Sequence, residues 1–275
     1  MTRRTIAIGI IGLWVIALAL YYRRTTHRTS EQMLADVAAR VAPETFYYVV
    51  EQAGRQVGAA SSAIDTSESR LVVTDLIRGV IRAGPDSLRL EARSQARFSR
   101  ALVLNDFVVQ AQGDLTPFEL RGIVQEGATK TVRLRAQPRG GSATTVDLPV
   151  TGPVFLPTSA TLPLMLRDRP RTGREIKLDV FDPIGRTMRS ATLRIERDSL
   201  FTVTDSATLD ETMGQWVPAH SDTVRAWRIG GDLPVMTAWV DADGRLVAAS
   251  EPGGLSLTRS AFELAFENLK RNARR

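Results

Sequence analysis

The sequence contains no cysteine, and its 275 residues include only two histidines and three lysines. Without cysteine the chain cannot form disulfides, thiol nucleophiles, iron–sulfur clusters or cysteine-ligated zinc, and it cannot be lipidated at an N-terminal cysteine. The histidines, His27 and His220, leave little scope for imidazole metal ligands. Arginine supplies nearly all of the positive charge behind a net charge of +6.

The sequence also lacks the motifs that position a nucleotide, a catalytic metal or an activated serine. It has no GxGxxG or GxxxxGKS/T phosphate-binding loop, no HExxH zinc motif and no GxSxG nucleophile elbow. We therefore predict a non-catalytic protein without a cofactor or a metal. A hydrolase built on two carboxylates is the remaining catalytic alternative, but spacing singles out no pair of acidic residues.

A strongly apolar, uncharged run extends from Thr5 to Tyr22 and is flanked by arginine pairs. At ~1.5 Å per helical residue it spans ~27 Å, close to the thickness of a bilayer core. We predict a transmembrane signal anchor in the inner (cytoplasmic) membrane, with residues 1–4 as a cytoplasmic tip and the bulk of the chain in the periplasm. A signal peptide cleaved after Ala17–Ala19 is the alternative, because a small-residue pattern stands there.

The chain after this run is expected to form one domain. Residues 23–30 are polar and typical of a linker, and Ser30 is a suitable N-cap for a short amphipathic helix. No long linker interrupts the rest of the chain, so we expect one extracytoplasmic domain over residues 31–270, with a weak seam near 150–158. The basic residues 271–275 form a tail that either contacts anionic lipid or is frayed.

Alternation of apolar and polar residues dominates this domain. In residues 88–98, apolar side chains alternate with arginine, glutamate and glutamine, and the pattern recurs in 132–136, 175–180 and 191–196. A period of two is typical of a strand with one face on a core and the other in water. The sequence thus predicts a mainly β (α+β) fold: a long antiparallel curved sheet, or incomplete β-barrel, of about ten or more strands and a few helices.

Two helices are expected within this β region. Ser159 precedes a segment that places Leu162, Met165 and Leu166 on one side, between flanking prolines. We expect this helix to act as a movable cover over the concave face of the sheet. The second helix is predicted over Thr258–Leu269, where phenylalanine, alanine and leucine recur on one face.

Two acidic patterns admit a functional interpretation. The segment Asp241–Gly244 is similar to the start of a calcium loop, but Arg245 stands where an oxygen ligand is needed, so a hairpin turn is favoured. His220 stands beside Ser221 and Asp222, and these are the three residue types of a catalytic triad. Adjacent strand residues point to opposite faces, so an exposed, solvated histidine is favoured.

Arginine and tryptophan are the remaining candidates for ligand-binding residues. The arginines alternate with acidic residues and lack an accompanying aromatic platform, so nucleic acid is not expected as a partner. Trp216, Trp227 and Trp239 lie in consecutive strand-like segments. On one face of a sheet they would line an apolar groove, and otherwise they belong to the core.

The order of elements resembles that of the periplasmic lipoprotein-carrier superfamily and its DUF3108-like relatives. The resemblance is carried by the early amphipathic helix, the pattern YxVxxxGxxVG at Tyr48–Gly58, the helix midway, and the segments GDLPVMTAWVDADGRLVAAS and RSAFELAFENLK. In that family an incomplete barrel wraps around helices, and its apolar concave face holds acyl chains or covers a partner. The resemblance implies a lipid, a lipoprotein or an envelope protein as partner. The transglutaminase-like domain of some relatives is absent, and soluble carriers keep no anchor.

These observations lead to one expected function and one alternative. We expect an envelope protein, anchored in the membrane by Thr5 to Tyr22, that binds an apolar or acylated ligand or a protein partner in a half-barrel groove. The alternative is a structural or accessory module of an envelope complex, with a barrel filled by its own side chains. The residues expected to line the groove are Leu88, Leu90, Phe98, Leu134, Leu162, Met165, Leu166, Ile176, Leu178, Leu193 and Trp239.

Overall fold

The computed structural model describes most of the chain after the predicted anchor. The described residues are 42–67, 70–83, 86–114, 116–127, 130–150, 152–157, 159–166, 168–182, 185, 187–232, 237–251 and 254–272. The predicted tip, anchor and linker at 1–30, the helix expected after Ser30, and residues 273–275 of the basic tail lie outside them. In the described ranges, no helix is both long enough and apolar enough to cross a membrane.

In the described ranges, fifteen strands form one sheet, in the order β8-β7-β6-β5-β4-β3-β2-β1-β15-β14-β13-β12-β11-β10-β9. The first arm consists of β1 (Glu44–Gln52), β2 (Arg55–Thr66), β3 (Arg70–Ala83), β4 (Asp86–Ser99), β5 (Leu104–Gly113), β6 (Phe118–Gln125), β7 (Thr131–Pro138) and β8 (Thr144–Pro149). The second arm consists of β9 (Val154–Phe155), β10 (Glu175–Asp182), β11 (Thr187–Asp210), β12 (Gln215–Gly231), β13 (Thr237–Val240), β14 (Leu246–Ser250) and β15 (Leu255–Ser260). The helical segments are α3 (Thr161–Leu166), η1 (Glu263–Glu267) and α4 (Asn268–Asn272).

The first and last strands meet in the middle of the sheet. β1 pairs antiparallel with both β2 and β15, so the two edges of the sheet are β8 and β9, which are neighbours along the chain. Among the described strands, β9 and β10 make the one parallel pair. The predicted seam near residues 150–158 falls where the chain passes from one edge strand, β8, to the other edge strand, β9. The mainly β, curved and open sheet predicted from the sequence is confirmed.

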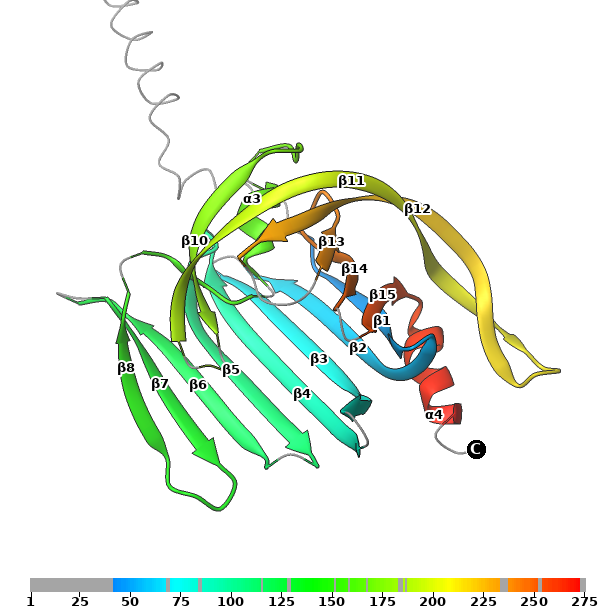
Figure 1. Ribbon diagram of the computed structural model, residues 1–275, viewed down its shortest axis with the longest axis horizontal. Helices are drawn as coiled ribbons and strands as arrows, with labels where there is room; N and C mark the ends of the chain where they lie inside the picture. The colour runs from blue at the N-terminus through cyan, green and yellow to red at the C-terminus, as the bar shows by residue number, and fades with distance from the viewer. Residues whose placement is uncertain are drawn as a thin grey trace, which may run out of the picture.

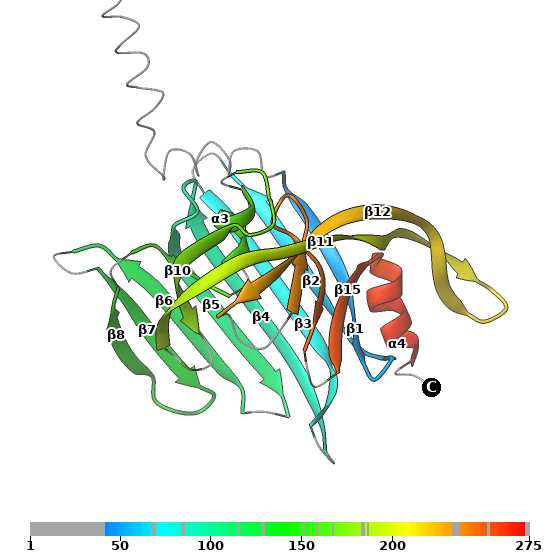
Figure 2. The same ribbon diagram turned by 45° about the horizontal axis from the view of Figure 1, so that its top comes forward.

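The two arms pack face to face, and we call the sheet face on which they meet the concave face. Figures 1 and 2 show β10, β11 and β12 crossing over the first arm, with α3 beside them. One buried cluster contains side chains from both arms and α3, including Phe107 of β5 and Phe181 of β10, whose ring centroids lie 5.1 Å apart. The distal part of the β11–β12 hairpin projects beyond the rest of the molecule in both views.

The alternation of apolar and polar residues explains which side chains of the first arm are buried. β3 and β4 pair along their whole fourteen-residue lengths, and the predicted run at 88–98 lies within β4. Its apolar residues Ala96 and Phe98 are buried, whereas Arg93, which precedes them in the run, is exposed. The turn between β1 and β2 places Ala53 and Gly54 at φ values of 51° and 73°. Positive φ at both central residues is typical of the type I′ turns that join twisted antiparallel strands.

The C-terminal helix begins later than predicted. Residues 258–260 belong to β15, because Ser260, Arg259 and Thr258 pair in register with β1. The helix then starts with a π-helical turn, η1, and continues as α4 to Asn272, two residues into the predicted tail. η1 packs on the convex face of the first arm, where Phe266 lies beside Ala59 and Tyr47.

Candidate functional site

A cavity of about 690 Å³ lies between the two arms. Its lining is mainly apolar and includes Ile77 and Val109 from the first arm and Leu193, Ile229 and Leu246 from the second. Pockets for small ligands typically have a volume of roughly 300–1,000 Å³ and combine apolar walls with a few placed polar groups. The cavity therefore has the size and lining of a ligand site.

A row of polar residues crosses the first-arm wall of the cavity. Ser62, Asp75 and Ser94 pair directly across β2, β3 and β4. The Ser62 hydroxyl donates a hydrogen bond to Asp75 Oδ1 at 2.7 Å, and the Ser94 hydroxyl donates to Asp75 Oδ2 at 3.1 Å. Alternation along β3 places Asp75 on the same face as Ile77. A carboxylate is thus held within an otherwise apolar wall.

A carboxylate of the second arm lies on the sheet face opposite the cavity, because its partners Arg228 and Gly230 alternate along β12 with the cavity-lining Ile229. A register shift between Ile195 and Arg197 places Glu196 at a β-bulge. Its carboxylate lies 3.1 Å from Arg228 Nε. A Cβ atom on Gly230 would come within 2.0 Å of Glu196 Oε1, so the glycine provides the space that this carboxylate occupies.

A buried network closes the cavity near β1 and β15. The Arg259 guanidinium donates to Asp241 Oδ2 at 2.8 Å, and its Nε donates to the carbonyl of Leu246 at 2.9 Å. The Tyr48 hydroxyl donates to the same carbonyl at 3.2 Å. Burial raises the pKa of Tyr48 well above its ordinary value, and the nearby Arg259 acts in the opposite direction. Tyr48 is therefore a neutral donor at physiological pH.

Most of the residues predicted to line a groove belong to the core. Phe98, Leu134, Leu162, Met165, Leu178 and Leu193 lie in the cluster shared by both arms, and Leu166 and Ile176 pack against it. Leu88 and Leu90 are half-buried near the start of β4. Among the predicted residues, Leu193 is the one that also lines the cavity.

Trp239 lies on the opposite sheet face from the cavity. Its neighbours in β13, Ala238 and Val240, line the cavity, whereas Trp239 packs against Phe201 with ring centroids 5.0 Å apart. Trp227 belongs to the core cluster, and the backbone of Trp216 is bonded to the side chain of Asn268. The three tryptophans therefore do not form one groove.

The helix α3 is packed as core and not as a movable cover. Thr161 to Met165 are all buried, and Leu164 is fully enclosed. Leu162 also packs closely against Gly244, at the turn between β13 and β14. In that turn Gly244, and not Asp243, takes a positive φ, and Asp241 Oδ1 accepts the backbone N–H groups of both Asp243 and Arg245. The Asp241–Gly244 segment is thus a hairpin turn.

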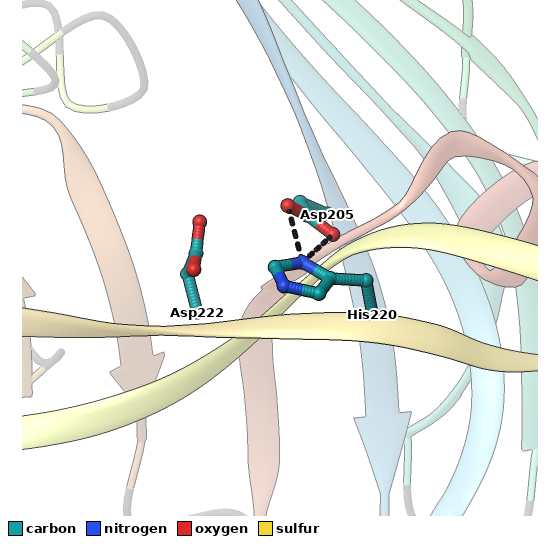
Figure 3. A group of neighbouring side chains, drawn as sticks. All are labelled: Asp205, His220 and Asp222. Carbon is teal, nitrogen blue, oxygen red and sulfur yellow. Dashed lines mark hydrogen bonds and ion pairs between the residues drawn. The ribbon is translucent and has the colours of Figure 1, made fainter.

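The exposed face of the β11–β12 hairpin carries a histidine and two aspartates (Figure 3). His220 Nδ1 lies 2.9 and 3.0 Å from the two carboxylate oxygens of Asp205, and Asp222 lies two residues further along β12. The hydrogen bond to Asp205 raises the pKa of His220 and lowers that of Asp205. Ser221 instead bonds to the Thr204 hydroxyl at 3.2 Å, so these residues do not assemble a triad.

Sequence reasoning missed the polar residues of the cavity. The sequence does give one indication that Asp75 points inward, because alternation within β3 puts it on the same face as Leu71, Val73 and Ile77. The alternation does not identify the inward face, since Val72 and other residues of the opposite face are also apolar. Nothing in the sequence places Asp75 in a cavity between two arms, because this depends on how the arms pack.

Comparisons with known proteins give little guidance. No protein-family model matches the chain, and no curated protein matches it. The lipoprotein-carrier resemblance is thus not confirmed and stays a prediction. Among solved structures, the chain is similar to the crystal structure of a β-barrel-like protein of DUF1849, a domain of unknown function, from Brucella abortus. The TM-score is 0.48 and the identity 13%, with 80% of this chain and 96% of that chain covered. A structural similarity at this level supports no inference about function.

Proposed function

We propose that this protein is a non-catalytic binding protein of the cell envelope that holds an apolar or acylated ligand between its two arms. The observation that supports the proposal is the cavity of about 690 Å³ with apolar walls from both arms. The apolar segment Thr5 to Tyr22 would anchor the protein in the inner membrane and leave the sheet in the periplasm.

A second function has an observation in its favour. Part of the concave face is already filled, because α3 and the facing strands of both arms form one buried cluster. An accessory module of an envelope complex, with a partner on another surface, would need no ligand in the cavity. Binding measurements separate the two functions.

The test is to fill the cavity from a small wall residue. Ala92 lines the cavity and is half-buried, so Ala92→Trp places an indole in the space that a ligand would use. We expect the full-length chain, in nanodiscs of zwitterionic lipid, to bind a neutral naphthylamine dye saturably. Ala92→Trp should weaken that binding by about tenfold or more, because the displaced apolar contacts supply most of the affinity.

The matched control is Ala143→Trp, the same change at an exposed residue of the β7–β8 loop. It should leave dye binding unchanged. Equal dye binding by the parent and Ala92→Trp would show that the dye partitions into lipid or surface sites, and would support the accessory module.

A further inference from the structure

The β11–β12 hairpin brings three metal-ligating side chains together outside the cavity. Asp205, His220 and Asp222 each offer one ligand atom, and these three atoms lie within 4.8 Å of one another. Figure 3 shows both carboxylates on the same side of the hairpin as the His220 ring. One imidazole nitrogen with two carboxylate oxygens is a donor set that suits a divalent transition metal.

The strand geometry accounts for this convergence. His220 and Asp222 are two residues apart on β12, so alternation directs both side chains to one face. On β11 the register shifts between Thr204 and Ser206, which makes Asp205 the extra residue of a β-bulge. A bulge re-aims the side chain of the extra residue, and here the carboxylate of Asp205 lies 2.9 and 3.0 Å from His220 Nδ1. Two strands therefore supply the three ligands.

The cluster favours positive charge at the imidazole ring. Two carboxylates face one imidazole, so the cluster stays negatively charged even when His220 is protonated. The hydrogen bond from Asp205 and the charges of Asp205 and Asp222 all raise the pKa of His220. Both aspartates thus stabilise a proton at the ring, and a divalent cation would bring two positive charges to the same place.

The cluster is also open to solvent. The side chains of His220 and Asp205 are 62% and 46% exposed, so an ion reaches them without a change in the fold. An ion pair this exposed contributes little to stability, and its residues can be replaced without unfolding the chain. Three protein ligands leave a further coordination position for water, as in open zinc sites.

We propose that Asp205, His220 and Asp222 bind a divalent transition-metal ion of the zinc type, with the imidazole as nitrogen ligand and one oxygen from each aspartate. A protonated imidazole releases one proton to solvent when the metal binds, because the ligating nitrogen must be unprotonated. The imidazole distinguishes this site from a purely acidic one, since carboxylates alone suit Mg²⁺ or Ca²⁺. The site does not involve the cavity, so it goes beyond the proposed function.

The test is calorimetric titration of Zn²⁺ and of Mg²⁺ into the full-length chain in nanodiscs of zwitterionic lipid. His27→Gln is the background throughout, so that His220 supplies the one imidazole. We expect one Zn²⁺ to bind per chain, about a hundredfold or more tightly than Mg²⁺. His220→Gln and Asp222→Asn should each weaken Zn²⁺ binding by about tenfold or more, because each removes a ligand.

The matched control is Asp198→Asn, which removes the same charge from an exposed residue of β11 outside the cluster. It should leave the affinity for Zn²⁺ unchanged. Equal binding of Zn²⁺ and Mg²⁺ assigns the ion to carboxylates alone and overturns the inference. Absence of saturable Zn²⁺ binding, or Zn²⁺ binding that is unchanged in His220→Gln, overturns it as well.

NMR of the imidazole decides the question if a variant alters the circular dichroism. In the His27→Gln chain, saturating Zn²⁺ should shift the ring signals of His220 and stop their titration near neutral pH, and a chelator should restore it. Ring signals that titrate normally in excess Zn²⁺ overturn the inference, even where calorimetry records an adventitious ion elsewhere on the chain.

Discussion

At the scale of single residues, two adjacent glycines shape the contact between β12 and β11 in the second arm. A Cβ at Gly230 would lie 2.0 Å from Glu196 Oε1, so the carboxylate would have to move. Gly231 has φ +123°, and a Cβ there would lie 1.9 Å from the carbonyl oxygen of Thr192. The first glycine therefore allows the Glu196–Arg228 pair to form, and the second allows β12 to remain close to β11.

The Asp205–His220 pair predicts that the stability of the fold depends on pH. The imidazole of His220 reports the state of the pair. The pKa of His220 is raised above its ordinary value of 6.5, chiefly by the hydrogen bond to Asp205, and that of Asp205 is lowered below 3.8. The contribution of His220 to stability is present below its unfolded-state pKa and is lost as pH rises through the raised value. That of Asp205 is present above its unfolded-state pKa and is lost as pH falls through the lowered value. The pair thus stabilises the fold between the two folded-state values.

An NMR titration of the imidazole measures this directly. We expect Asp205→Asn to lower the pKa of His220 toward 6.5, and Asp222→Asn to lower it less, because Asp222 contributes the smaller effect. His27 is the only other histidine in the sequence, so a His27→Gln background leaves one imidazole signal. An unchanged pKa in Asp205→Asn would contradict the pairing.

At the scale of elements, the local pattern of apolar and polar residues predicted the strands well and the helix boundaries poorly. The alternation over 88–98 predicted β4, because its inward residues meet the core and its outward residues meet water. The apolar spacing after Thr258 predicted a helix that starts five residues before η1 does, since pairing with β1 holds residues 258–260 extended. The side chain of Gln56 then donates to the carbonyls of Leu264 and Ala265 within the π-helical turn, a contact that sequence spacing does not reveal.

The packing of α3 gives a stability prediction. Leu164 is fully buried, whereas Leu166 is only half-buried at the end of the helix. We expect Leu164→Ala to lower the free energy of unfolding by about 2–5 kcal/mol, because it leaves a cavity in the shared core. Leu166→Ala is the matched control and should cost clearly less. Urea denaturation followed by circular dichroism measures both, and an equally small loss in the two variants would mean that α3 is a loosely held cover after all.

At the scale of the whole molecule, the sheet class was predictable and its topology was not. Alternation and turn residues show that the chain forms an antiparallel sheet, but they do not show that β1 pairs with β15 and leaves β8 and β9 as edges. The candidate site depends on that topology. Ser62, Asp75 and Ser94 meet through strand register, and Leu193 and Ile229 face the same cavity only because the second arm folds over the first.

The shared core predicts that the two arms unfold together. Phe181 of β10 is fully buried against Phe107 of β5, so Phe181→Ala should lower the free energy of unfolding by about 3–5 kcal/mol. In a Trp14→Phe background, all remaining tryptophans lie on β12 and β13 of the second arm, whereas far-UV circular dichroism reports the strands of both arms.

We therefore expect the fluorescence and circular dichroism transitions in urea to coincide in the parent, and to move together to lower urea in Phe181→Ala. Phe262→Ala makes the same chemical change at a side chain that is 38% exposed, and it should shift both transitions much less. Two separated transitions in the parent would show that each arm has its own cooperative core. That result would contradict the packing of Phe107 against Phe181 as the contact that joins the arms across the cavity.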